Sequence, residues 1–119
     1  MTRGLILVNL TQEHAETACE AARQIRAETM HIVPANPGRV LAEIAVIGER
    51  PIPLGQMPAF REEIVFFWNI EEVGREICLA LFRDKGLKNV IKAVNTPVNM
   101  NWTLTRLRDN LIEEHRNVR

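Results

Sequence analysis

Two short runs of the chain are apolar at nearly every position. Residues 4–10 (GLILVNL) and 64–68 (IVFFW) show no polar face, which is typical of strands covered on both sides of a sheet. We expect both to be central strands. Two weaker runs, at residues 30–35 and 90–94, contain Pro34 and Lys92, and these residues favour sheet edges.

Amphipathic segments follow each of the four strands. The first begins at Thr11, which we expect to be its N-cap, and continues to about Thr29. The second covers Val40–Ile47, where the pattern fits a short helix but leaves an extra strand open. These two segments alternate with the strands along the chain.

The third and fourth helices are better delimited. Asn69 and Glu72 have the spacing of a capping box, and Gly86 supplies the left-handed position that ends the helix. A loop at residues 95–101 leads to the last helix, with Trp102 expected in its first turn and Asn99 or Asn101 as its cap.

The order β-α-β-α-β-α-β-α predicts one α/β domain spanning residues 1–119. We expect a small three-layer sandwich with a four-stranded parallel sheet, in the flavodoxin-like strand order 2-1-3-4. The alternative is a ferredoxin-like α+β fold, which needs antiparallel pairing. We find no internal repeat and no low-complexity segment in the sequence.

Composition excludes several classes of protein. The chain has 15 basic and 15 acidic residues among 119, so no net charge draws it to nucleic acid or to a membrane surface. No apolar stretch approaches the ~20 residues of a membrane span, and we expect a cytoplasmic protein. Cys19 and Cys78 are not at metal-ligand spacing, so two reduced buried thiols are expected.

Common catalytic motifs are absent from the sequence. No glycine-rich phosphate loop follows the first strand, and no acidic pair like that of a response-regulator receiver is present. The chain has neither serine nor tyrosine, which excludes a serine hydrolase. We predict no cofactor and no metal site.

Asparagines recur where the predicted strands end. If all strands are parallel, their carboxyl ends meet at one edge, where amides beside helix N-termini can hold an anion. The competing interpretation is that Asn caps helices and tolerates strained turns. The candidate ligand-binding residues are Asn9, Thr11, Asn36, Asn69, Lys92, Thr96, Asn99 and Trp102.

These residues favour a non-enzymatic binding or regulatory module with a polar, uncharged edge that takes a small anion or nucleotide. Lys92 is placed to reach a phosphate, although a lysine extending from a sheet edge is the ordinary case. The alternative is a small enzyme, or enzyme subunit, acting on a phosphorylated or nucleotide-like substrate through Thr11, His14, Lys92 and Thr96. A purely structural subunit is a third possibility.

A proline-rich apolar stretch at residues 49–60 (ERPIPLGQMPAF) follows the second helix. An exposed patch of this kind is unusually adhesive. We therefore predict a homodimer that uses the Pro51–Phe60 region.

The C-terminal segment from Lys92 to Thr103 has the pattern K-A-x-x-T-P-x-N-x-x-W-T, with Glu113-Glu114-His115 further on. It resembles the closing motif of a small, uncharacterised bacterial domain-of-unknown-function family. Val98 and Asn110 depart from that family, in which Thr and an acidic residue are usual. The resemblance implies a bacterial or archaeal protein with Thr96, Pro97, Asn99 and Trp102 in a hallmark loop; it implies no activity.

Overall fold

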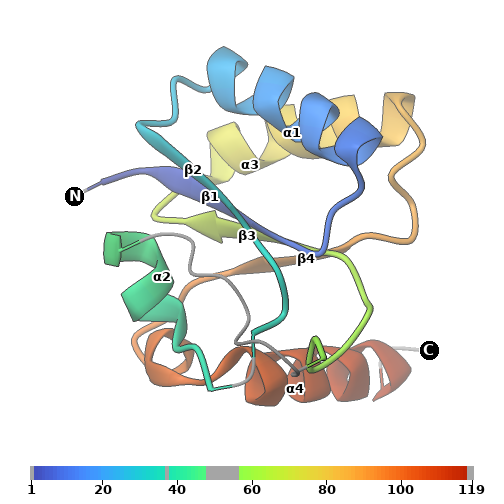
Figure 1. The fold of residues 1–119 in the computed structure, drawn as a ribbon. Helices are drawn as coiled ribbons and strands as arrows, with labels where there is room; N and C mark the ends of the chain where they lie inside the picture. Colours follow the sequence, from blue (N-terminus) through green and yellow to red (C-terminus); the bar gives the residue numbers. More distant parts are fainter. Residues whose placement is uncertain (1, 37, 48–56, 118–119) are drawn as a thin grey trace.

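The computed structural model describes residues 2–36, 38–47 and 57–117, and its helices lie on both faces of one sheet (Figure 1). Helices α1 and α3 cover one face, and α2 and α4 cover the other. The elements are β1 (Gly4–Val8), α1 (Gln12–Gln24), β2 (Thr29–Val33), α2 (Leu41–Ile47), β3 (Ile64–Trp68), α3 (Glu72–Asp84), β4 (Ile91–Val94), a short 3-10 helix η1 (Asn99–Asn101) and α4 (Leu104–Asn117).

The strand order β2-β1-β3-β4 is the predicted one, but the sheet is mixed. β1 pairs in parallel with β2, and β3 with β4, whereas β1 and β3 are antiparallel. The prediction of an all-parallel sheet is therefore wrong at its central pair. An apolar run indicates that both faces of a strand are buried, but it does not indicate the direction in which the strand runs. In the structure, β3 begins at the edge of the sheet where β1 ends.

A side-chain contact marks this reversal. The Asn9 amide, just after β1, donates to the backbone carbonyls of Phe60 at 2.9 Å and Glu62 at 3.1 Å. The chain is thereby held at the carboxyl end of β1 immediately before β3 begins.

The two halves of the chain are structural repeats related by an approximate two-fold axis. Ile6 lies opposite Phe66, and each position of β1 and α1 corresponds to the position 60 residues later in β3 and α3. Helices α1 and α3 have 13 residues each. Asn9 and Asn69, which follow β1 and β3, both have positive φ, at 60° and 56°. The repeat preserves backbone geometry more than residue identity, which is why the sequence does not reveal it.

The core forms two layers separated by the sheet. Leu5 and Leu7 point towards α1 and α3, whereas Ile6 and Val8 point towards α2 and α4. Because successive side chains of a strand face opposite sides, each apolar strand contributes to both layers. All five residues of β1 are buried, as expected for a central strand.

Several local predictions are confirmed and one, at the start of α3, is wrong. Thr11 is the N-cap of α1, and its hydroxyl oxygen accepts from the His14 backbone N–H. Val40–Ile47 resolves as the helix α2 at Leu41–Ile47. Gly86 has a φ of 81°, as predicted for a helix end. Asn69 is not an N-cap, because it adopts a left-handed conformation and Glu71 takes the cap position.

The start of α4 also differs from the prediction. The Thr103 hydroxyl accepts from the Arg106 backbone N–H, so Thr103 performs the capping role expected of Asn99 or Asn101. Trp102 precedes the helix in extended conformation. Among the described helices, none is long and apolar enough to cross a membrane.

Candidate functional site

The antiparallel central pair separates the candidate residues predicted for one edge. Asn9, Thr11 and Asn36 lie near the carboxyl ends of β1 and β2, while Asn69 and Thr96 lie near those of β3 and β4. Because β1 and β3 run in opposite directions, these are opposite edges of the sheet. The candidates do not form one amide-lined site.

The Asn9 side-chain amide at the first edge bonds to the chain's own backbone, and the Asn36 backbone forms a local turn. Asn9 Oδ1 accepts from the Ala35 backbone N–H at 2.9 Å, and its Nδ2 donates to two carbonyls. Asn36 is buried, and its backbone N–H donates to the Pro34 carbonyl at 2.7 Å. These contacts support the interpretation of these asparagines as turn-forming residues.

Thr11 and His14 share a carboxylate at the same edge. Glu63 Oε2 accepts from the Thr11 backbone N–H at 3.1 Å and lies 2.7 Å from His14 Nδ1. Since Glu63 stands just before β3, this contact ties the start of α1 to the central pair.

At the opposite edge, Asn69 and Asn95 bond to each other. The Asn69 backbone N–H donates to Asn95 Oδ1 at 2.8 Å, and Asn95 Nδ2 donates to Asn69 Oδ1 at 2.9 Å. Asn69 Nδ2 also donates to the Thr2 carbonyl at 2.9 Å. This pair joins the end of β3 to the end of β4.

The hallmark loop is likewise closed on itself. The backbone N–H of Thr96 donates to Asn99 Oδ1, and that of Asn99 donates to the Thr96 hydroxyl. Asn99 Nδ2 donates to the Val94 carbonyl at the end of β4. Trp102 packs against the core beside α4, and the Arg106 guanidinium lies 4.4 Å from the centre of its ring.

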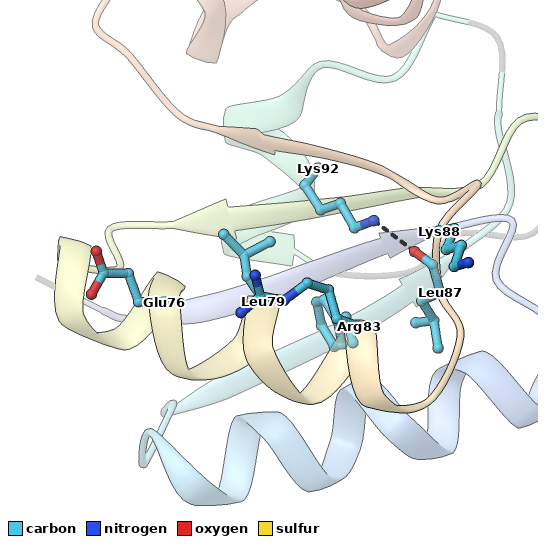
Figure 2. A pocket seen from close by; sticks show the side chains of 7 residues that line it. Glu76, Leu79, Arg83, Leu87, Lys88 and Lys92 are labelled. Carbon is cyan, nitrogen blue, oxygen red and sulfur yellow. Dashed lines mark hydrogen bonds between the residues drawn. The ribbon is translucent and has the colours of Figure 1, made fainter.

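A groove of about 520 Å³ lies between α3 and β4 (Figure 2). Its volume is within the range of small-molecule sites. Its apolar residues belong to α3 and to the turn that follows this helix. Its three cations, Arg83, Lys88 and Lys92, also line the groove. The lining residues are Glu76, Leu79, Phe82, Arg83, Leu87, Lys88 and Lys92.

Lys92 is the half-buried cation of this groove. Figure 2 shows it reaching from β4, and its Nζ donates to the Leu87 carbonyl at 2.6 Å. Burial lowers the pKa of Lys92 from its ordinary value of 10.5, because desolvation disfavours the charged form. Across the described residues, none of Arg83, Lys88 and Lys92 forms an ion pair.

The corresponding positions of the first half carry a different set of side chains. Arg23 is equivalent to Arg83, but Glu28 replaces Lys88. Met30 replaces Lys92, because Met30 pairs with Leu5 and Lys92 with the equivalent Val65. The fold therefore does not require the excess of positive charge found beside β4.

Lys92 is among the candidates predicted from the sequence, whereas Arg83 and Lys88 are not. A signal was present: the chain has three lysines, and all of them lie at positions 85, 88 and 92, whereas its arginines are spread along the chain. No motif connects these residues, because one is on a helix, one in a turn and one on a strand.

The described residues include no group of three or more His, Cys, Asp or Glu arranged to hold a metal ion. Cys78 is buried, and desolvation raises its pKa to about 11, so its thiol is protonated at neutral pH. Cys19 is partly buried, with its sulfur 3.5 Å from the Arg23 guanidinium.

Residues 63–118 match the model of a family described as a domain of unknown function (DUF3783). This part of the chain is thus similar to an uncharacterised domain family. The match runs from the start of β3 to the end of α4, which is one of the two structural repeats. No curated protein and no solved structure matches the chain.

Proposed function

We propose that this protein is a non-enzymatic binding module, and that its ligand is a small anion with an apolar body held in the groove between α3 and β4. Lys92 carries the proposal. Its ammonium group is half-buried beside Leu79 and Leu87, and its bonded partner is one carbonyl oxygen. A ligand carboxylate or phosphate there would supply the opposite charge.

The chemistry of the lining supports an anion with an apolar body. Arg83 and Lys88 add two cations, and Glu76 contributes one negative charge. Leu79, Phe82 and Leu87 offer apolar contact area, which favours burial of a hydrocarbon group at about 25 cal/mol per Å². The ligand predicted for an uncharged edge is thus assigned to a cationic groove.

The alternative enzyme has less support. Its proposed residues Thr11 and His14 lie at the edge where β1 ends, whereas Thr96 lies at the opposite edge. Lys92 stands apart from both, on the groove. These side chains are not arranged around one substrate.

The homodimer prediction concerns a segment that is mostly outside the described residues. Of Pro51–Phe60, the structure describes residues 57–60. Met57 is 74% exposed, whereas Phe60 is 7% exposed and packs in the core beside α4. The apolar character of the stretch is therefore partly used inside the protein.

Calorimetric titration with octanoate tests the proposal. Acetate and 1-octanol are the control compounds. Acetate lacks the apolar body, and 1-octanol lacks the charge. We expect octanoate to bind more tightly than both.

Two arginine variants locate the binding. Arg83→Gln should weaken octanoate binding about three- to tenfold, because it removes one groove cation. Arg23→Gln, at the equivalent position of the other half, should leave it unchanged. Equal losses in both variants, or no binding of octanoate, would contradict the proposal.

A further inference from the structure

Lys92 is a nucleophile as well as a cation. We propose that Lys92 captures the ligand covalently, as a reversible imine with a 2-oxo carboxylate that carries an apolar side chain. This inference rests on the proposed function, because Arg83 and Lys88 must first hold the carboxylate in the groove.

The position of the amine supports this chemistry. Lys92 extends from a strand into a groove with apolar walls, and it has no carboxylate partner among the described residues. Desolvation and neighbouring cations are the two conditions that activate lysines for imine formation. Desolvation lowers the pKa of Lys92, which increases the fraction of neutral amine at a given pH.

The reaction balances without another reactant. The Lys92 nitrogen attacks the ketone carbon and forms a C–N bond, and the carbonyl oxygen leaves as water. The Lys92 ammonium group gives two hydrogens to the water that forms and becomes a protonated imine. The positive charge on the nitrogen is therefore conserved. The protonated imine retains one N–H group. This group can still donate to the Leu87 carbonyl, which lies 2.6 Å from Lys92 Nζ in the structure.

The groove has a lysine at position 92, although arginine is the more frequent cation of this chain. Arginine makes the ion pairs elsewhere, as in Arg3–Glu71 and Arg108–Glu62. Arginine does not form imines under these conditions, whereas lysine shifts its pKa readily when buried. All three lysines of the chain lie between residues 85 and 92, and Lys85, which does not line the groove, serves as an internal standard for reactivity.

The competing explanation for Lys92 is structural. A charged side chain on an edge strand prevents sheets from pairing edge to edge. In that case Lys92→Met, which introduces the residue of the equivalent position Met30, would cause self-association, and Lys92 would show no selective reactivity. That combination would overturn the proposal.

The test treats the full chain with 2-oxooctanoate and cyanoborohydride, and peptide mass mapping follows the reduced adduct at each lysine. We expect Lys92 to react about tenfold faster than Lys85, because the groove holds the ketone beside the Lys92 amine. Excess octanoate should block the reaction, and 2-octanone, which lacks the carboxylate, should react much more slowly. Equal rates at the three lysines, or equal rates with 2-octanone, would refute the inference.

Two variants separate reactivity from folding. Lys92→Arg keeps the charge and should lose the adduct while melting cooperatively by circular dichroism. Arg83→Gln keeps the amine and should slow its modification. If octanoate binds by calorimetry but Lys92 is not selectively trapped, the covalent step fails and the proposed function stands. If octanoate does not bind either, both fail.

Discussion

Ile6 of β1 lies directly opposite Phe66 of β3, at the centre of the sheet and on the approximate two-fold axis that relates the two halves. Both side chains are fully buried and belong to the layer beneath α2 and α4. The antiparallel pair that contains them joins two parallel β-α-β units into one sheet. The two halves therefore depend on a shared centre.

Phe66→Ala should lower the free energy of unfolding by about 3–5 kcal/mol, because it leaves a cavity where both halves meet. Urea denaturation followed by tryptophan fluorescence and circular dichroism should give one coincident transition. Val73→Ala, at a residue that is 65% exposed, is the control and should change stability by less than about 0.5 kcal/mol. Two separate transitions in the wild-type protein would show that the halves fold independently.

Asn9 should stabilise the folded protein. Asn9→Ala removes three hydrogen bonds and puts alanine at a φ of 60°, so we expect a loss of about 3 kcal/mol. Asn9→Gly should recover about 1 kcal/mol of this, because glycine tolerates the left-handed conformation.

Asn9→Asp gives a near-isosteric control. It should also destabilise the protein at neutral pH, because an oxygen would face the carbonyls of Phe60 and Glu62. The free energies come from urea titration. A fully stable Asn9→Ala variant would show that this amide does not hold β3 in place.

The sequence predicts the element types, the strand order and the positions of the edge strands, because these follow from hydrophobic periodicity and from Pro34 and Lys92. It does not predict the direction of β3. That direction depends on where the chain re-enters the sheet, which Asn9 marks by binding the carbonyls before β3. A contact between residues more than 50 positions apart has no local pattern.

The candidate site is divided for the same reason. Once β3 is reversed, the asparagines at the strand ends fall on opposite edges and bind the backbone or each other. Lys92 was identifiable from its place on an edge strand. Arg83 and Lys88 were not, because the groove depends on how α3 packs beside β4.

The Glu62–Arg108 pair should make stability depend on acid pH. The hydrogen bond from Arg108 lowers the pKa of Glu62 below 4.5, and the two contacts are 3.1 and 2.7 Å long. The stabilisation is therefore fully present above about pH 4.5 and is lost as the pH falls through the lowered pKa. Because both side chains are about one-third exposed, we expect no more than about 1 kcal/mol.

A comparison of Arg108→Gln with the wild type at pH 7 and pH 3 by urea denaturation checks this effect. The difference between the two proteins should be larger at pH 7. In the background of Glu62→Gln, where Arg108 keeps its contact with Asp109 at 2.7 Å, the dependence on pH should be smaller. A difference that grows at pH 3 would contradict the assignment.

The pKa of Lys92 should lie below 10.5 because of burial. NMR titration of ¹³C-dimethylated lysines measures it directly, and the assignment follows from Lys92→Arg. Leu79→Ala should admit water to the groove and raise the pKa of Lys92 back towards its ordinary value. An unshifted Lys92 in the wild type would show that its amine is fully solvated.

The most direct test of the central claim, that the groove between α3 and β4 is the ligand site, is a ¹H–¹⁵N NMR titration of the full chain with octanoate. We predict shift changes that saturate and that concentrate on Leu79, Arg83, Leu87, Lys88 and Lys92. The equivalent residues Cys19, Arg23 and Met30 should not respond. Saturating changes centred instead on Asn9 and Thr11, or on Asn69 and Thr96, would contradict the claim.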